Sequence, residues 1–494
     1  MELLERLEAV ELNLKEFLTD NFDFRLDAEY FLKEYLSKLE MLKKVGYKKI
    51  SDFCYVTDGI HTSIDYCTNS NINLFSATTP RENFFDLSRQ VFISEKAQLA
   101  NPRTALKVND VIISTVGTIG NCAVVNKSVL PANSDRHVGI IRIEKDFYPR
   151  YISTFLLSKF GRFQTWREST GNVQLNLFLY RIRTLKIANL SLPFQEVIEN
   201  LVLLNDLKRE ESKTAYSKAE TILLQEIGLD REVIGLNPVE VTEQAVEGSN
   251  PSMFTNNGAN KNVNVKSFKD SFGVTGRLDA EYYQKKYEVV IEKIKSYKNG
   301  FEPLFIACNL KDSNHNPKEN QEYNYIELSN IGKTGDINGC TTELGKNLPS
   351  RARRIVNTND VIISSIEGSL QSCAVVGKEY NNALCSTGFY VINSEKINSE
   401  TLIVLFKSDL MQSIMKQNCS GTILTGMNKY EFQNILVPLI EKKAQQEIAQ
   451  LIEESFSLKK QSEYLLEVAK RAVEIAIEEN EAAAMAYINE NVKS

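Results

Sequence analysis

Three short polar segments of this sequence carry the side-chain types best suited to recognition chemistry. Residues 134–137 read Ser-Asp-Arg-His, residues 351–354 read Arg-Ala-Arg-Arg, and Gln174 and Asn176 lie two residues apart. Arginine, glutamine and asparagine form paired hydrogen bonds with guanine and adenine, and arginine also binds phosphate groups. The chemistry that these segments favour is therefore recognition of nucleic acid.

Residue combinations that catalyse reactions are missing from the sequence. It has no Pro-Pro pair and so no Asn/Asp-Pro-Pro-Tyr/Phe methyltransferase motif, and the stretch from Gly339 to Asn347 departs from a Walker A phosphate loop. The three histidines lie in unrelated contexts, and the eight cysteines contain no Cys-x-x-Cys pair. We therefore expect no catalytic residue, no metal site and no cofactor, with the chemistry supplied by a partner protein.

The sequence contains one large repeat. Three short segments occur twice, in the same order and about 250 residues apart: RLDAEY at 25–30 and 277–282, NDVIIS at 109–114 and 359–364, and CAVV at 122–125 and 373–376. This period is much longer than the units of about 20–50 residues in solenoid proteins. The chain is therefore a tandem duplication of a whole domain.

The net charge of −6 is unevenly distributed. Residues 24–190 carry 23 Lys and Arg against 15 Asp and Glu, a net charge of +8, and residues 266–438 carry 20 against 19, a net charge of +1. Phosphate attraction depends on local charge, because salt screens it within about 10 Å. The basic first block therefore remains compatible with nucleic-acid binding.

The sequence indicates a soluble, cytoplasmic protein with reduced cysteines. It has no apolar run of the roughly 18 residues that a membrane helix needs. Its first segment, residues 1–23, is acidic, whereas a signal peptide begins with basic residues. We expect no membrane partner.

Each repeat reads as mixed α and β structure followed by a long helix. Val111–Ser114, Cys122–Val125 and Val138–Ile143 have the composition of strands. Asp27, and Asp279 in the second copy, are placed to cap a helix.

The long helices are predicted after Leu192-Pro193 and after the junction taken as equivalent, Val437-Pro438. They extend from about 196 to 225 and from about 442 to 485. Leucines close to seven-residue spacing predict that the two helices pack on each other, with a polar and weaker middle in the first helix: Leu201, Leu204, Leu451, Leu458 and Leu465.

The repeated segments, together with residues 169–176 (STGNVQLN) and the two proline junctions, resemble the specificity subunit of type I restriction–modification systems. The resemblance covers essentially the whole chain. It implies an α+β fold, built as a tandem pseudo-repeat of two mixed α/β DNA-recognition domains. Each domain is followed by a long α-helix, and the two helices pack as an antiparallel coiled-coil spacer.

The resemblance also implies a function and partners. The subunit would be a non-catalytic reader of double-stranded DNA, with each domain recognising one half of a bipartite, asymmetric target. Two DNA adenine methyltransferase subunits would bind the helical frame, and motor/nuclease restriction subunits would join them in defence against phage. One departure is that Phe194-Gln195-Glu196 stands where the family has Glu-Gln, whereas Gln445-Gln446 serves in the second copy.

On this interpretation the chain has six segments. They are an N-terminal helix (1–23), target recognition domain 1 (24–193), spacer helix 1 (194–230), a linker (231–265), target recognition domain 2 (266–438) and spacer helix 2 (439–494).

Positions that differ between the copies are the best candidates for base contacts, because two different half-sites need different readers. The RLDAEY segments do not differ, which favours a helix cap with a local ion pair. For the arginines, a solvated charged surface is an equally good interpretation. The candidate DNA-binding residues are Arg81, Arg89, Arg103, Arg136, His137, Gln174, Asn176, Arg351, Arg353, Arg354, Thr422 and Thr425.

Three alternatives stay open. The chain could be the same type of reader serving a type II enzyme with fused methylase and nuclease. It could be a divergent DNA methyltransferase or nuclease, which binding of S-adenosylmethionine by the isolated chain would reveal. It could also be a scaffold or ligand-binding protein, for which any DNA binding would be insensitive to salt.

Overall fold

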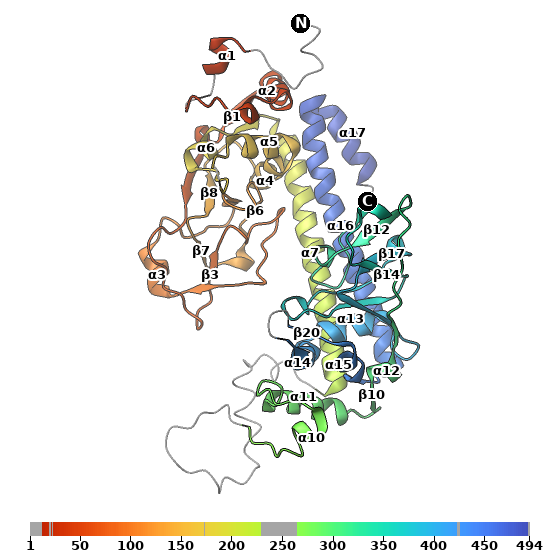
Figure 1. Cartoon of the computed structure of the whole chain (residues 1–494). Helices are drawn as coiled ribbons and strands as arrows, with labels where there is room; N and C mark the ends of the chain where they lie inside the picture. Colours follow the sequence, from red (N-terminus) through yellow and green to blue (C-terminus); the bar gives the residue numbers. More distant parts are fainter. Residues whose placement is uncertain are drawn as a thin grey trace. The chain divides into compact units, whose positions relative to one another are not determined.

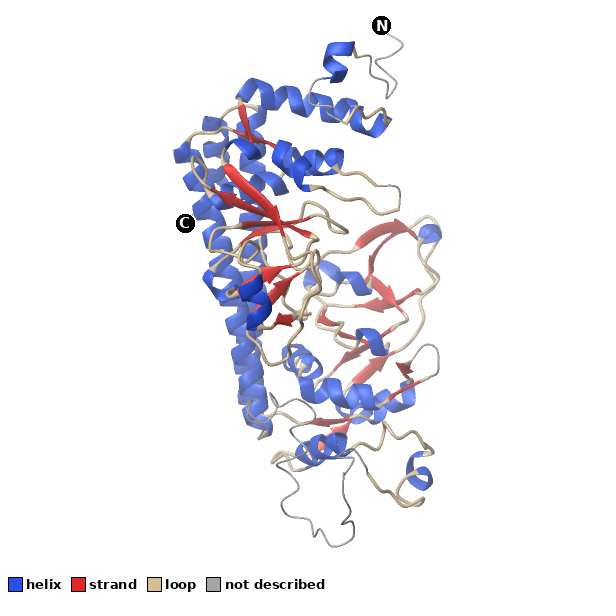
Figure 2. Ribbon diagram, turned by 90° about the vertical axis from the view of Figure 1, so that its left-hand side faces the viewer, coloured by secondary structure: helices blue, strands red, loops and turns tan. Residues whose placement is uncertain are grey.

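The computed structural model describes residues 12–18, 21, 23–171, 173–228, 264–421 and 425–492. The chain divides into two compact units, one formed by Met1–Arg209 with Lys460–Ser494 and the other by Glu210–Lys459. Both units combine helices with sheets (Figures 1 and 2), which confirms the predicted α+β fold of two mixed domains. Each unit includes part of both long helices, and the six-segment division stays a prediction. All but the last two residues of the linker and most of the N-terminal helix lie outside the described residues.

The described residues of the first unit form nine strands and the helices that cover them. The strands are β1 (Tyr47–Lys49), β2 (Cys54–Asp58), β3 (Ile72–Phe75), β4 (Phe92–Ile93), β5 (Val111–Ser114), β6 (Cys122–Val124), β7 (Ala132–Ser134), β8 (Val138–Ile143) and β9 (Lys186–Ala188). The helices are α1 (Leu14–Leu18), α2 (Lys33–Val45), α3 (Glu95–Ala100), α4 (Pro149–Leu157), α5 (Lys159–Glu168), α6 (Leu179–Thr184) and the C-terminal α17 (Glu481–Asn491).

The second unit repeats this arrangement with additional strands. The strands are β10 (Phe301–Pro303), β11 (Asn309–Lys311), β12 (Glu322–Ile326), β13 (Thr341–Leu344), β14 (Ala352–Val356), β15 (Val361–Ser364), β16 (Cys373–Val375), β17 (Ala383–Ser386), β18 (Phe389–Asn393), β19 (Cys419–Ser420), β20 (Gly426–Met427) and β21 (Leu436–Pro438). The helices are α10 (Phe272–Thr275), α11 (Lys285–Lys295), α12 (Leu304–Ala307), α13 (Ser399–Lys407), α14 (Asp409–Gln417) and α15 (Lys429–Asn434). Among the described residues, no helix has the length and apolar character needed to cross a membrane.

A four-stranded antiparallel sheet is the centre of each unit. Its strand order is β2-β8-β5-β6 in the first unit and β11-β18-β15-β16 in the second. Side chains on the central strand β5 alternate between two cores. Val111 and Ile113 face the helices, whereas Ile112 joins the core shared with a second sheet, of strand order β4-β3-β7. Because both faces are buried, the strand is apolar throughout. The strands predicted from the repeat are confirmed.

The Asn-Asp pair before this strand has a structural role in both copies. Asn109 and Asn359 adopt positive φ angles of 72° and 69°, which asparagine tolerates better than most residues. The buried carboxylates of Asp110 and Asp360 accept hydrogen bonds from the backbone N–H groups three residues earlier in the turn, at 2.9 and 2.8 Å. Burial raises the pKa of Asp110, although the neighbouring Arg142 opposes this effect.

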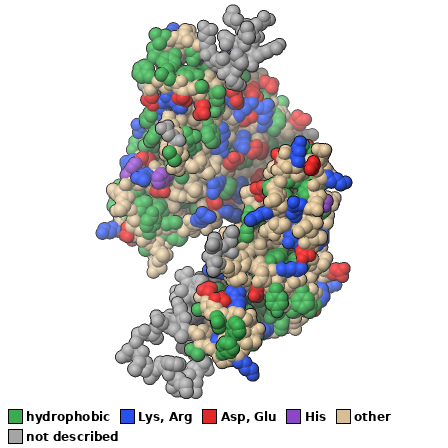
Figure 3. Space-filling model, in the orientation of Figure 1, with side chains coloured by type: hydrophobic (Ala, Val, Ile, Leu, Met, Phe, Trp, Pro, Cys, Tyr) green, Lys and Arg blue, Asp and Glu red, His purple; other side chains and the backbone are tan. Residues whose placement is uncertain are grey.

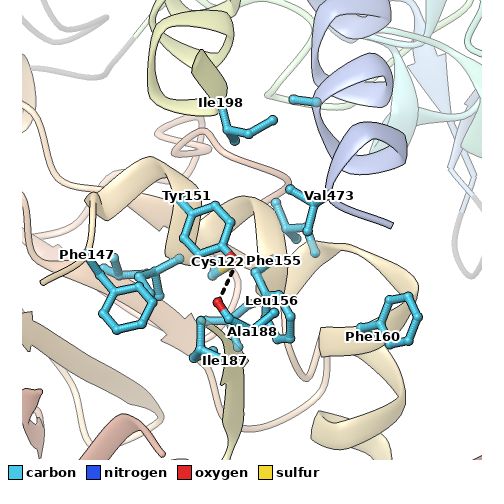
Figure 4. Close-up of a cluster of buried hydrophobic side chains, with 14 of the residues drawn as sticks. Cys122, Phe147, Tyr151, Phe155, Leu156, Phe160, Ile187, Ala188, Ile198 and Val473 are labelled. Atoms are coloured by element: carbon cyan, nitrogen blue, oxygen red, sulfur yellow. Dashed lines mark hydrogen bonds between the residues drawn. The ribbon is translucent and has the colours of Figure 1, made fainter. Parts of the chain in front are cut away.

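The core of the first unit joins its four-stranded sheet and the helix α4 to both long helices, α7 (Leu192–Ile227) and α16 (Lys442–Glu478). Figure 4 shows Tyr151 and Phe155 of α4 packed with Ile198 of α7 and Val473 of α16. The Tyr151 hydroxyl donates a 2.7 Å hydrogen bond to the backbone oxygen of Ala188 in β9. This bond fixes α4 against the strand that leads into α7.

The helices α7 and α16 run antiparallel (Figure 1), and small and polar side chains bond across their contact. The side-chain amide of Asn205 donates to the Ser462 backbone oxygen at 2.7 Å. Seven residues further along α7, Ser212 bonds Ser455, which lies seven residues earlier on α16. Of the leucines predicted for the contact, Leu201, Leu458 and Leu465 are buried, whereas Leu204 is 36% exposed. The prediction was wrong at Leu204, because its neighbour Asn205 is the residue that contacts α16.

The second long helix is shorter than predicted. It ends at Glu478 rather than near Met485, and α17 begins at Glu481. The side chain of Asn480 accepts a hydrogen bond from the Ala483 N–H at 2.9 Å, the geometry of an N-cap that starts a new helix.

The two helix junctions are equivalent through glutamines rather than through prolines. Pro438 lies in β21, the counterpart of β9, so its expected pairing with Pro193 was wrong. Gln195 accepts a hydrogen bond from the Tyr148 N–H, and Gln445 accepts the same bond from the Asn398 N–H. Each glutamine thereby fixes the first turn of a long helix to the start of α4 or α13.

Replacing Tyr151 by phenylalanine tests the contact between α4 and β9. We expect Tyr151→Phe to lower the free energy of unfolding by about 1–2 kcal/mol, because the carbonyl of Ala188 stays buried without its donor. Trp166, the single tryptophan of the sequence, lies in the first unit, so its fluorescence during urea unfolding reports on that unit. The exposed Tyr55 gives the control Tyr55→Phe, which should leave the transition unchanged.

Candidate nucleic-acid interface

One edge of the four-stranded sheet gathers the loops of the first unit. Strands β2 and β5 end at Asp58 and Ser114, and β6 and β8 begin at Cys122 and Val138. Neighbouring strands are antiparallel, so these four ends lie along the same edge. The segment that carries Arg136 and His137 leads into β8 here, and Asn176 pairs with Val116, just after β5.

Backbone hydrogen bonds bring two of the predicted segments together at this edge. The Thr115 N–H donates to the His137 oxygen at 3.1 Å, and Thr115 in turn accepts from the Leu177 N–H at 2.9 Å. Asn176 and Thr170 exchange backbone bonds of 2.8 and 2.9 Å, closing the loop that carries Gln174. His137, Gln174 and Asn176 therefore belong to one surface.

Two glycines allow these loops to approach closely. A Cβ atom at Gly59 would lie 2.1 Å from the backbone oxygen of Asp135, so only glycine fits there. Gly171 has a φ of 144°, and Gly421, at the same place in the second copy, has a φ of 132°. The Thr-Gly and Ser-Gly pairs are needed for the loop conformation in both units.

Charged side chains cover this edge. Arg103 contacts Thr57 and lies 3.4 Å from Asp58, which also pairs with His61. Arg136 is exposed and lies 3.4 Å from the ring of His137. Figure 3 shows histidine and Lys/Arg side chains gathered on the face of this unit around β7 and β8. The sequence did not predict these contacts with Asp58. Arg103 is distant from Asp58 in the sequence, and His61, although close to it, belongs to no recognised motif.

Arg81 and Arg89 lie apart from the Arg103 side of the edge. Arg81 is 3.5 Å from Asp86, in a turn held beside β6 by a 2.9 Å bond from the Asn83 N–H to the Cys122 oxygen. Arg89 is exposed in the loop before β4. Their assignment to DNA stays a prediction.

The second unit presents the equivalent edge with different side chains. The Thr387 N–H donates to the Arg351 oxygen at 2.8 Å, and the Glu367 N–H donates to the Thr425 oxygen at 3.0 Å. The guanidinium of Arg354 donates to the backbone oxygen of Lys311, the last residue of β11, at 3.2 Å. Arg351, Arg354 and Thr425 therefore come together here, whereas Thr422 lies outside the described residues.

Arg353 brings further residues to this surface that the sequence did not single out as DNA-binding. Its backbone oxygen accepts from the His315 N–H at 2.6 Å, and its side chain bonds Asn316. Lys429 pairs with Asp312 just after β11. In the described part of the chain, Nε of Arg354 and Nε2 of His315 are buried without a hydrogen-bond partner. Both are polar groups able to bond a ligand at this edge.

The repeated RLDAEY segment is a structural support for the loops. Asp27 caps a short 3-10 helix, Ala28–Phe31, by accepting from the Tyr30 N–H, so it does not cap α2 as predicted. Arg25 forms a two-bond contact with Asp27 and also donates to the Arg167 oxygen at the end of α5, at 2.7 Å. The hydrogen bond from Arg25 lowers the pKa of Asp27.

A buried charged network lies where α5 runs into the Gln174 loop. Arg181 is 1% exposed and bonds Glu168 at 2.7 Å, and it also pairs with Asp23. Arg167 bonds Glu168 at 3.1 Å and stacks 3.7 Å from the centre of the Tyr30 ring. Burial is the largest single influence on Arg181 and lowers its pKa, but the charges of Glu168 and Asp23, together with the contacts to Tyr180 and Tyr30, outweigh burial and raise the pKa of Arg181.

Burial also raises the pKa of Tyr30, and the charge of Glu168 adds to this effect. The second unit replaces the network by amides. The side-chain amide of Gln417 donates to the backbone oxygen of Tyr282 at 2.8 Å, and Asn418 occupies the position of Glu168 in the first copy. Arg277 keeps its contact with Asp279 and donates to the Cys419 oxygen at 3.0 Å.

No group of His, Cys, Asp or Glu among the described residues has the arrangement to hold a metal ion. A hollow of about 600 Å³ lies on the second half of α7. It is open to solvent and is lined by Lys213, Thr214, Ser217, Lys218, Thr221, Ile222 and Leu451.

Neutralising Glu168 tests the charged network. We expect Glu168→Gln to destabilise the first unit by about 3 kcal/mol, the lower end for breaking a buried ion pair, because Asp23 still neutralises Arg181 from the exposed side. Urea unfolding followed by Trp166 fluorescence measures the change. The exposed pair of Glu34 and Lys38 offers the control Glu34→Gln, for which the midpoint should barely move. An unchanged midpoint in Glu168→Gln would show that the network is not structural.

The family model for the type I restriction modification DNA specificity domain matches residues 301–467, from β10 into α16. The match includes the loops of the second edge. No curated protein matches the sequence.

Three solved structures are similar along most of the chain. The S subunit of a type I restriction–modification system from M. genitalium is 11% identical, with 87% of this chain and 94% of that chain covered and a TM-score of 0.41. The HsdS subunit from Thermoanaerobacter tengcongensis is 13% identical over 88% and 97%, with a TM-score of 0.28. A structure described by the assembly and conformational transition of the type I R-M system is 12% identical over 90% and 97%, with a TM-score of 0.25.

Proposed function

This chain carries the DNA specificity domain of type I restriction–modification systems, and from that premise we propose that each of its two units reads one half of a bipartite, asymmetric DNA target. The family match confirms the resemblance drawn from the repeats. The observation that supports the proposal is the repeated sheet edge. Equivalent strands carry equivalent loops, while the side chains on those loops differ.

The chemistry of the two edges suits base recognition in different sequences. The first edge offers Arg136, Gln174 and Asn176, and the second offers Arg351 and Arg354. Arginine pairs with guanine, and glutamine or asparagine pairs with adenine. Arg81, Arg89, Arg103 and Arg353 would bind phosphates and fix the register, and His137, Thr422 and Thr425 would add polar contacts.

We further propose that the chain is a non-catalytic subunit that requires no cofactor. Two adenine methyltransferase subunits and motor/nuclease restriction subunits would dock on it, and α7 with α16 would set the number of base pairs between the half-sites. The methyltransferase would take its target adenine out of the DNA stack into its own pocket, so a reader needs no such pocket.

Separate substitutions in the two units test the bipartite target. We expect Arg136→Ala to relax one half of the methylated motif and Arg351→Ala to relax the other, with about tenfold weaker binding of the cognate sequence in each case. The measurement is a single-molecule methylome of the host expressing each variant with its methyltransferase. Lys43→Ala, an exposed site on α2, is the control that should leave the motif intact. If both arginine variants relax the same half of the motif, the assignment of one half-site to each unit is wrong.

The salt dependence of DNA binding tests the phosphate contacts. Each phosphate that the protein contacts makes the slope of log affinity against log salt steeper by about 0.9. We expect Arg89→Ala to make the slope shallower by about that amount, equally on cognate and non-cognate DNA. Arg89→Lys should retain the wild-type slope. Titration of the complete complex over a range of salt concentrations gives the slopes. A sequence-dependent loss in Arg89→Ala would instead make Arg89 a base reader.

A further inference from the structure

The repeated RLDAEY segment exposes the same leucine in both units. Leu26 is 83% exposed and Leu278 is 71% exposed, whereas the arginine and the final tyrosine of each segment are partly or fully buried. The other repeated segments consist of turn residues and buried strands, whose identity the fold explains. A leucine exposed to this extent adds little to the stability of its own unit. The fold therefore does not account for its presence in both copies.

An exposed tyrosine accompanies each leucine. Tyr180 is 48% exposed and Tyr430 is 73% exposed, each being the second residue of α6 or α15. The Tyr180 hydroxyl donates to Asp23 at 2.9 Å, three residues before Leu26. In the second unit, Glu431 lies 4.0 Å from Arg277, the residue before Leu278. The leucine and the tyrosine therefore belong to one surface in each unit.

Carboxylates surround both leucines. Asp27 and Glu29 are exposed in the first unit, and Asp279 and Glu281 are exposed in the second. Asp27 and Asp279 each pair with the neighbouring arginine, so the surface offers little free charge to the phosphates of nucleic acid, and its exposed leucine and tyrosine favour a protein partner with an apolar pocket. Figure 3 shows hydrophobic side chains gathered around the N-terminal segment of the first unit and around α10 and α11 of the second.

We infer that the surfaces around Leu26 with Tyr180 and Leu278 with Tyr430 are two copies of one docking site, and that each takes one copy of the adenine methyltransferase subunit. The inference rests on the proposed function for the identity of the partner. A partner that binds twice needs the same contacts twice, whereas two different DNA half-sites need different contacts. The exposed residues that are identical in both units meet the first requirement, and the loops at the sheet edges meet the second.

The stoichiometry of the complex tests this inference. The variants are Leu26→Asp, Leu278→Asp and the double variant, each mixed with the purified methyltransferase subunit of the same system and measured by native mass spectrometry. We expect two bound methyltransferase subunits for the wild type, one for each single variant and none for the double variant. Each lost site should bind at least about tenfold more weakly, as for a leucine removed from the centre of an interface. Leu99→Asp, at a leucine that is also exposed but has no repeated counterpart, should retain two.

DNA binding of each variant chain and its urea unfolding complete the test. A double variant that unfolds like the wild type and still binds two methyltransferase subunits overturns the inference. Variants that bind two subunits but lose DNA affinity assign the surface to nucleic acid and overturn it as well. If the wild-type chain itself binds neither the methyltransferase nor DNA, the proposed function fails, which is a different result from loss confined to the leucine variants.

Discussion

The antiparallel contact between α7 and α16 is the constraint on which the rest of the structure depends, because each unit is completed by a piece of both helices. In the first unit, Val473 and Ile488 from the C-terminal part of the chain enter the same core as Tyr151. In the second, Leu223 of α7 enters the core that contains Ile448 of α16. Neither sequence repeat therefore holds all the residues of one unit, and the two repeats must fold together. The small and polar residues along the helix contact follow from this role, since they allow close approach while their buried hydroxyls and amides bond each other across it.

Identical residues in the two repeats are concentrated at positions where burial or backbone conformation allows few residue types. The strands Val111–Ser114 and Val361–Ser364 are buried on both faces, and the asparagines before them occupy a backbone region that few residues tolerate. The sheet edges have no such restriction, because a loop there needs only its glycine turn and its backbone bonds. Side chains can change at these edges without a cost to the core, which is the condition that a reader of two different sequences must satisfy.

The sequence predicted the features that depend on local residue type and failed where distant contacts decide. The strands and the two long helices follow from composition and periodicity, and all were found. The orientation of Leu204 could not be predicted, because the polar middle of α7 looked like a weak seam when its Asn205 and Ser212 were in fact the contacting residues. The break at Asn480 was hidden by a heptad pattern that continued close to it. At the candidate interface, the clustering of His137 with Asn176 follows from the strand ends, but the approach of His315 to Arg353 joins residues that share no motif.

The two units support equivalent loops with different chemistry. In both units, an arginine that pairs with a nearby aspartate donates to a backbone oxygen where a helix runs into the loop. Arg25 donates to the oxygen of Arg167 at the end of α5, and Arg277 donates to the oxygen of Cys419 just after α14. Carbonyl groups at a helix end lack partners within the helix, and a cation there is favoured by the helix dipole. In the first unit a charged pair, Arg181 on Glu168, lies beside this contact, whereas in the second unit amide side chains take the places of Arg167 and Glu168 and Glu431 lies 4.0 Å from Arg277. Burying charges carries a desolvation cost that amides largely avoid, so the charges are not required by the fold. What the loop requires is a hydrogen-bond donor for the carbonyl group at the helix end, and the repeated arginine is that donor in both units.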